Sequence, residues 1–205
     1  MPVWVPEYRL APEHPYPAGL NDALACYAQL RNHYAAEQIV VAGYSAGWAL
    51  TLALALALRE RGEPLPAALL LISPVTDSTL SGRTLVSKYG EDPMLRRDWL
   101  EQALHWYKPP FDAPAHRPLE LDLTGLPAML IQVGEQELLL SDSTRLAQQA
   151  THYAVPCRLE IHAARWHVFH LQALSLHSAR QAIGTLGVFA RQQVEAKATA
   201  ASRIV

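Results

Sequence analysis

The apolar positions of this chain fall into short continuous runs and into longer segments with a helical period. Four short runs predict strands, at residues 39–42, 67–72, 128–133 and 158–162, and residues 3–5 are a fifth candidate. Residues 67–72 are apolar throughout, as expected of a strand that is buried on both faces. The runs therefore predict a sheet that lies largely in the interior.

Segments with apolar residues every three or four positions predict helices between these strands. They cover residues 20–34, 46–60, 93–107, 141–153 and 169–194. Asp92 is expected to cap the third of these helices, with Pro93 in its first turn, and Ser141 is expected to cap the fourth. The alternation favours an α/β fold, a mainly parallel sheet flanked by helices. We expect one domain over residues 1–194 and a frayed tail over residues 195–205.

Composition narrows the class of protein. The 205 residues are 50% hydrophobic and carry a formal net charge of −2, with no long run of one charge, which argues against a nucleic-acid surface. The longest apolar run, residues 46–58, is too short to span a bilayer, and no signal peptide is apparent, so a cytoplasmic location is expected. Cys26 and Cys157 lie in apolar periodic segments and suit buried thiols better than a disulfide or a metal site.

The motif Gly-x-Ser-x-Gly at residues 43–47 lies between a predicted strand and a predicted helix. This is the strand–turn–helix context of a nucleophile elbow, with Ser45 at the head of the helix. Both glycines are expected to permit a close backbone approach where a side chain would clash. The backbone N–H of Ala46, at the positive end of the helix, is a candidate donor to an oxyanion.

Polar residues follow three of the strands and supply candidates for a catalytic triad. Ser45 follows the second strand candidate, Glu135 and Glu137 follow the fourth, and His167 follows the fifth. Carboxyl ends of parallel strands share one edge of the sheet, where ligands bind. The chain order of serine, acid and histidine is that of an α/β-hydrolase triad. A serine hydroxyl needs an imidazole to accept its proton, and a carboxylate to orient that imidazole.

Residues alone leave alternatives for two members of this triad. Among nine histidines, His167 is favoured over His170 because it lies in the loop before the last helix begins. For the acid, Glu137 competes with three other carboxylates that follow strands, Glu135, Asp142 and Asp77. Asp142 has a competing role in the first turn of a helix, where it complements the dipole.

A family resemblance accounts for these features together. Residues 8–18, YRLAPEHPYPA, resemble the YRLAPEHPFPA signature of the hormone-sensitive-lipase-like esterases, which are α/β-hydrolases that cleave carboxylic esters. Residues 43–47 resemble the family's GDSAG, and residues 123–127 resemble its LxGLPP segment. Residues 132–142 resemble a branch reading QVGSDEVLLSD, and residues 167–169 resemble the HxF motif.

The resemblance implies a role for each candidate residue. Ser45 would be the nucleophile, His167 the general base and Glu137 the acid, because Gln136 stands where the branch often has Asp. Arg9 is expected to pair with Glu13 or Asp22 beside the site. No metal or cofactor is implied.

Two departures from the family pattern bear on activity. Tyr44 and Trp48 replace the Asp and the last Gly of GDSAGG; Trp48 would narrow the pocket or repack the helix. Tyr44, Trp48 and Trp166 are the candidate pocket residues. The family's HGGG motif, upstream strands and cap are missing before Tyr8, so the chain resembles the C-terminal two-thirds of an esterase. The missing strand would leave a gap, or force residues 3–5 against residues 39–42.

Two hypotheses follow. The first is a hydrolase of small acyl esters or lactones, with a small-molecule ester as substrate and neither nucleic acid nor a membrane span. The second is a catalytically impaired hydrolase-fold fragment that binds a ligand or partner. Residues 158–162 would form an edge strand, which makes a homodimer through that edge plausible.

Overall fold

A parallel four-stranded sheet forms the centre of the protein in the computed structural model, which describes residues 2–110 and 120–202. The strands are β1 (Val40–Tyr44), β2 (Ala68–Ile72), β3 (Ala128–Gly134) and β4 (Cys157–His162), adjacent in chain order. Val40 is opposite Ala68, Ala68 is opposite Ala128, and Met129 is opposite Cys157. All four carboxyl ends therefore meet at one edge, as the sequence predicted.

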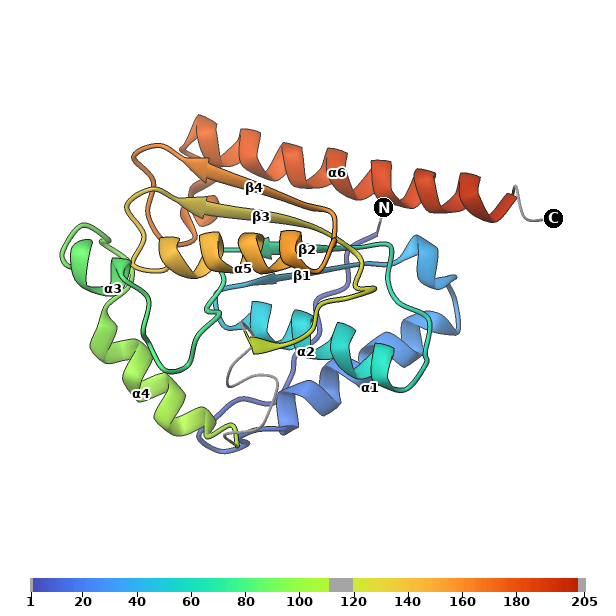
Figure 1. Ribbon diagram of the computed structural model, residues 1–205, viewed down its shortest axis with the longest axis horizontal. Helices are drawn as coiled ribbons and strands as arrows, with labels where there is room; N and C mark the ends of the chain where they lie inside the picture. The colour runs from blue at the N-terminus through green and yellow to red at the C-terminus, as the bar shows by residue number, and fades with distance from the viewer. Residues whose placement is uncertain (1, 111–119, 203–205) are drawn as a thin grey trace.

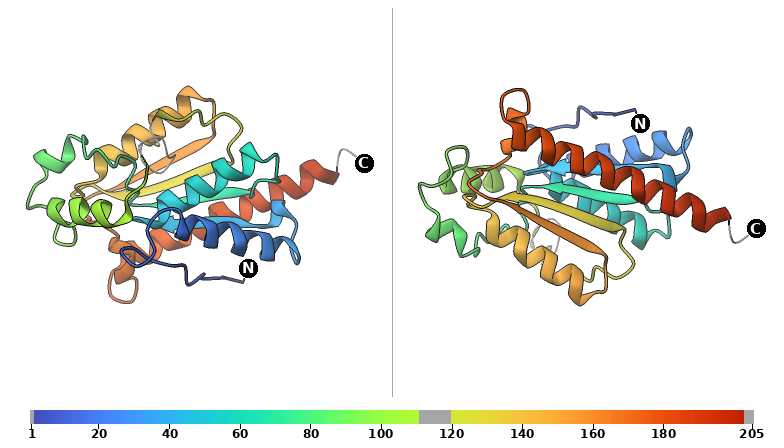
Figure 2. Two further views of the ribbon diagram at one scale, coloured as in Figure 1. Left: turned by 90° about the horizontal axis from the view of Figure 1, so that it is seen from below. Right: turned by 90° about the horizontal axis from the view of Figure 1, so that it is seen from above.

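Helices cover both faces of this sheet (Figure 1). Helices α2 (Gly47–Glu60) and α5 (Leu140–His152) lie on one face, and α6 (His177–Ser202) crosses the other, while α1 (Ala18–Arg31) packs against α2. Figure 2 shows α6 running obliquely across the face opposite α2 and α5. The smaller elements are α3 (Thr84–Ser87), α4 (Arg97–Tyr107) and the 3₁₀ turns η1 (Ala36–Gln38) and η3 (Phe169–Gln172).

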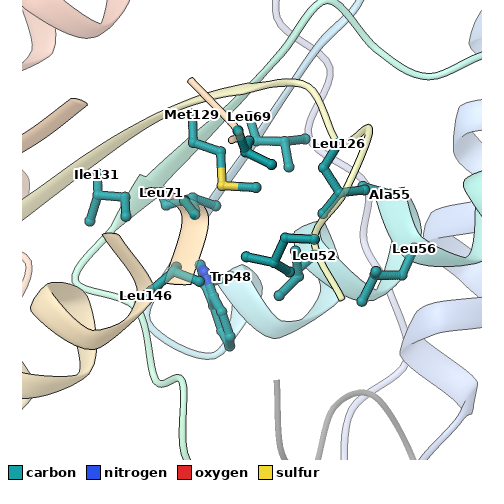
Figure 3. Packing of buried hydrophobic residues seen from close by; sticks show 13 residues of the cluster. Trp48, Leu52, Ala55, Leu56, Leu69, Leu71, Leu126, Met129, Ile131 and Leu146 are labelled. Atoms are coloured by element: carbon teal, nitrogen blue, oxygen red, sulfur yellow. The ribbon is translucent and has the colours of Figure 1, made fainter. Parts of the chain in front are cut away.

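Alternating side chains of the buried strands supply both cores. Leu69 and Leu71 of β2 join the cluster under α2 and α5, whereas Leu70 contacts the cluster under α6. Figure 3 shows the first cluster, in which Leu52 and Trp48 of α2 meet Met129 of β3. A strand with apolar residues at every position can serve two helical layers, because successive side chains point to opposite faces.

Residues 3–5 do not form the strand predicted for them. Val3, Trp4 and Val5 are exposed at 85%, 60% and 86%, and β1 is the edge strand on its side of the sheet. A strand requires a neighbour to complete its hydrogen bonds, and in the described residues no strand lies between this segment and β1. Of the two outcomes expected for a missing strand, the structure does not show the strands forced together.

Several helix boundaries also differ from the prediction. Asp92 does not cap α4, which begins at Arg97, and Ser141 lies inside α5, where its backbone N–H donates to Thr84 Oγ1. The predicted helix over residues 169–194 is two elements, η3 and α6, and α6 continues past Val194 to Ser202. The proline-rich segment between α4 and β3 includes residues 111–119, which lie outside the described residues.

Candidate active site

Ser45 stands on a sharp turn between β1 and α2. Its φ of +49° is in the left-handed region that side chains other than glycine rarely adopt. A Cβ at Gly43 would lie 2.4 Å from the backbone oxygen of Gly47, so this position must be glycine. At Gly47 a Cβ would meet nothing within 4 Å. The expected need for glycine is therefore confirmed at position 43 and wrong at position 47.

His167 reaches Ser45 from the loop that follows β4. Its Nε2 lies 2.9 Å from the Ser45 hydroxyl, across 122 residues of sequence. Its Nδ1 lies 3.1 Å from Oε2 of Glu137. A carboxylate can only accept at this contact, so Nδ1 carries the proton and Nε2 is free to accept the hydroxyl proton. The structure thus brings together the three residues that the sequence singled out.

Glu137 is completely buried, and each of its oxygens accepts hydrogen bonds. Oε1 accepts from the Ser73 hydroxyl at 2.7 Å and from the backbone N–H of Gly134 at 2.6 Å, while Oε2 faces His167. Three donors around one buried carboxylate compensate for its lost hydration and fix its direction. Ser73 also accepts a hydrogen bond from the N–H of Val168, so it links the acid to the histidine loop.

The competing histidine lies elsewhere. His170 is buried in η3, and its Nε2 lies 2.9 Å from Oε1 of Gln132. Its pKa is lowered to about 4, mainly by burial and to a smaller extent by the charge of nearby His162. It has no contact with Ser45 among the described hydrogen bonds. His170 is therefore an interior residue held by Gln132, and His167 is the histidine at the elbow.

The three other carboxylates have partners of their own. Asp142 accepts from the backbone N–H of Thr76, and burial raises its pKa to about 6. Burial tends to raise the pKa of Asp77, but hydrogen bonds from Ser81, Thr79 and Arg145 outweigh it and hold that pKa well below the usual range. Glu135 accepts from the N–H of Ala164. Only Glu137 of the four candidates contacts His167 within the described hydrogen bonds.

A cavity of about 410 Å³ opens beside Ser45 and Ala46. Its wall is mostly apolar and comes from α2, from α4 and from the loop before α1. The lining side chains of α4 are Trp99, Leu100, Ala103, Leu104, Trp106 and Tyr107. The site can therefore hold an apolar group next to Ser45 and Ala46, the residue that precedes α2.

None of the three pocket candidates from sequence lines this cavity. Trp48 is fully buried on the side of α2 that faces the sheet, in one cluster with Leu52 and Leu56 of the same helix (Figure 3). Trp166 packs against the cluster that contains Phe169 and Ala179, and Tyr44 is 57% exposed at the end of β1. Trp48 therefore does not narrow the cavity, which was one of the two effects expected of it.

The α4 wall was missed, although its sequence carried a signal. Trp99, Ala103 and Trp106 recur at helical spacing beside Leu100 and Leu104. Such a pattern predicts an apolar helix face, but it does not say what the face covers. Here Trp99 and Trp106 line the cavity beside Ser45 and remain 58% and 45% exposed, so this face borders a cavity and is not buried in a core.

The loop before α1 is held in place by an ion pair. Arg9 contacts both carboxylate oxygens of Asp22 on α1, through Nη2 at 2.8 Å and Nε at 3.0 Å. Hydrogen bonds from Arg9 lower the pKa of Asp22 to about 2. The predicted partner Asp22 is confirmed over Glu13, and the pair holds Tyr8 and Leu10 at the wall of the cavity.

The described residues offer neither a metal site nor a membrane-spanning helix. Within residues 2–110 and 120–202, no group of three or more His, Cys, Asp or Glu side chains is placed to hold a metal ion. No described helix combines the length and hydropathy needed to cross a bilayer.

Comparison with known proteins places these features in a family context. The family described as alpha/beta hydrolase fold matches residues 1–171. An acetyl-hydrolase of Streptomyces hygroscopicus is 36% identical over 191 residues, and an esterase of Acinetobacter venetianus is 34% identical over 189 residues. Each alignment covers 90% of this chain and 62% of the relative.

Solved structures give the same result in three dimensions. An esterase from the bacterial hormone-sensitive lipase family has a TM-score of 0.87 at 38% identity. The esterase EstE5, in a crystal soaked with p-nitrophenyl butyrate, has a TM-score of 0.86 at 36% identity. Both comparisons cover 92% of this chain and 64% of the other. The chain therefore spans less than two thirds of the length of these four proteins.

Proposed function

Because the chain belongs to the alpha/beta hydrolase fold family and resembles its hormone-sensitive-lipase-like esterases, we propose that it hydrolyses carboxylic esters with Ser45 as nucleophile. The observation that carries the proposal is the unbroken contact from Ser45 Oγ to His167 Nε2, and from His167 Nδ1 to Glu137 Oε2. Each member has the protonation role that its neighbour requires.

The proposed reaction has two steps. His167 accepts the hydroxyl proton as Ser45 attacks the ester carbonyl, and it then donates this proton to the departing alcohol as the acyl-enzyme forms. In the second step His167 activates water, which releases the acid and restores the serine. Glu137 holds the imidazole in the required tautomer and stabilises the imidazolium. The N–H of Ala46 donates to the carbonyl oxygen as it becomes an oxyanion.

The cavity suggests which esters are suitable. Its apolar wall beside Ser45 suits a small acyl ester or a lactone without charge near the carbonyl. The soak of EstE5 with p-nitrophenyl butyrate makes nitrophenyl esters a reasonable first substrate. Purified protein should hydrolyse p-nitrophenyl acetate and butyrate, and Ser45→Ala should reduce the rate to the level of buffer. Equal rates for the two proteins would contradict the proposal.

The second hypothesis is a hydrolase-fold protein that binds an ester without turnover. The described residues supply one candidate oxyanion donor, the backbone N–H of Ala46, and loss of one such donor typically costs about 10²- to 10³-fold in turnover. Saturable binding of a butyrate ester without hydrolysis would favour this hypothesis.

Two expectations about the whole protein stay proposals. β4 lies at one edge of the sheet, which supports a homodimer through that strand. Light scattering at micromolar concentration would test it, and a monomeric mass would count against it. The expected cytoplasmic location also stays a proposal, for which fractionation of cells is the test.

A further inference from the structure

One buried carboxylate outside the triad accepts hydrogen bonds from the loop of His167, from the loop of Glu137 and from the segment before α4. Asp92 is only 7% exposed and lies in the loop that leads to α4. Its Oδ1 accepts from the backbone N–H of His167 at 3.4 Å, and its Oδ2 accepts from the backbone N–H of Leu138 at 3.4 Å. Leu138 directly follows Glu137, so Asp92 touches the backbone of the histidine and acid loops at once.

The same carboxylate also fixes the start of the cavity wall. Oδ1 accepts from the N–H of Met94 at 3.0 Å and from the N–H of Leu95 at 3.3 Å. The Leu95 side chain lines the cavity and packs against the cluster that contains Leu100 and Leu138. Four backbone donors from three segments therefore converge on one side chain.

We propose that Asp92 is a positioning residue that holds the loops of His167 and Glu137 in register with the α4 wall of the substrate cavity. This inference rests on the proposed function, because it assigns Asp92 to the same reaction. Asp92 acts through the backbone of its neighbours and makes none of the proton transfers. A general base must stay within hydrogen-bond reach of its partner, and a displacement of about 1 Å can cost about 10²-fold in rate.

Two substitutions separate this role from bulk stability. Asp92→Ala removes the acceptor for all four N–H groups. Asp92→Asn keeps one oxygen acceptor. Its amide NH₂ replaces the second carboxylate oxygen, so a donor faces a backbone N–H that has an acceptor in the wild type. Asp122→Ala is the control variant. Asp122 also accepts a hydrogen bond from a backbone N–H, that of Thr124, but it lies in an exposed loop.

We expect kcat on p-nitrophenyl butyrate to fall about 10²-fold in Asp92→Ala and by a smaller factor in Asp92→Asn. Asp122→Ala should keep the kcat of the wild type. A rise in KM with unchanged kcat would overturn the proposal, since it would show that Asp92 supports substrate binding at the cavity wall and does not position His167 and Glu137. Circular dichroism identifies any variant that fails to fold; if Asp92→Ala unfolds, an unchanged kcat in Asp92→Asn overturns the proposal.

A second measurement does not depend on ester turnover. The ring Nδ1–H proton of His167, identified by its absence in His167→Ala, reports the hydrogen bond to Glu137 by NMR. We expect this signal in the wild type and in Asp122→Ala, and we expect it weakened or shifted in both Asp92 variants. An unchanged signal in folded Asp92→Ala would overturn the proposal. If the wild type hydrolyses no ester, the proposed function fails, while this signal still decides the role of Asp92.

Discussion

The Ser73 hydroxyl donates a 2.7 Å hydrogen bond to Glu137, in the interior and 64 residues away in sequence. Ser73 follows β2 and adopts a φ of +49°, so the chain accepts local backbone strain at the position that supports the acid. The same hydroxyl accepts from the N–H of Val168, next to the histidine. Ser73 thus helps to position both Glu137 and His167.

Removal of the Ser73 hydroxyl should lower activity equally in Ser73→Ala and Ser73→Gly, but the two variants should differ in stability. Ser73→Ala and Ser73→Gly both take a donor from the buried Glu137, and we expect each to lower kcat/KM by about tenfold, a loss typical of a hydrogen bond to a charged group. Glycine tolerates the positive φ, so Ser73→Gly should be more stable than Ser73→Ala by about 1 kcal/mol. Ester hydrolysis and urea unfolding measure the two effects. Activity unchanged in both variants would show that Ser73 does not support the acid.

Glu137→Gln should disable the site while the fold is kept. Its amide oxygen can still accept from Ser73 and Gly134, which directs the NH₂ group toward His167 Nδ1. Nδ1 must then accept, so Nε2 carries the proton and can no longer receive one from Ser45. We expect kcat to fall by about 10⁴-fold, the size of the loss when another triad carboxylate becomes an amide. A loss below tenfold, measured by steady-state hydrolysis, would argue that another group orients the imidazole.

The two glycines of the elbow should respond differently to alanine. Gly43→Ala places a methyl group 2.4 Å from the Gly47 oxygen and 2.5 Å from Thr51 Oγ1, so we expect a loss of about 3 kcal/mol in stability together with activity. Gly47→Ala meets open space in the first turn of α2 and should be neutral or stabilising by up to about 1 kcal/mol. Thermal unfolding of the two variants side by side checks this. Equal destabilisation would mean that the turn is arranged otherwise.

Acid should destabilise the protein partly through His170. Burial lowers its pKa in the folded state to about 4, while the unfolded chain binds this proton near 6.5. The folded state therefore binds fewer protons, and this stability is complete above about pH 6.5 and is lost as the pH falls toward 4. His170→Gln removes this proton site but keeps a donor for Gln132. Between pH 7 and pH 4 the wild type should lose about 3 kcal/mol more than the variant. Parallel unfolding curves at the two pH values would exclude this contribution.

The sequence predicted the sheet and the three meeting residues because both depend on strong local patterns. Apolar runs mark β1 to β4, and parallel strands end at one edge, so Ser45, Glu137 and His167 had to be near one another. The prediction failed for residues 3–5, because a strand depends on a neighbour that the local pattern does not contain. Periodicity also placed α4, without showing that its apolar face would border a cavity.

Side-chain direction was the harder problem. The closeness of Trp48 to Ser45 in sequence predicts a pocket residue, but successive residues of a helix point in different directions, and Trp48 points toward the sheet. Asp92 followed by Pro93 predicts a helix cap, but α4 begins later, at Arg97. Its actual partners include His167 and Leu138, which are 75 and 46 residues away in sequence. Such contacts arise only when distant loops meet.

The most direct test of the account is the site and rate of modification by a fluorophosphonate, located by peptide mass spectrometry. We expect one adduct on Ser45 in the wild type. In folded His167→Ala we expect a much slower reaction, because the Ser45 hydroxyl then lacks its base. An unmodified Ser45, or an adduct that forms at the same rate without His167, would contradict it.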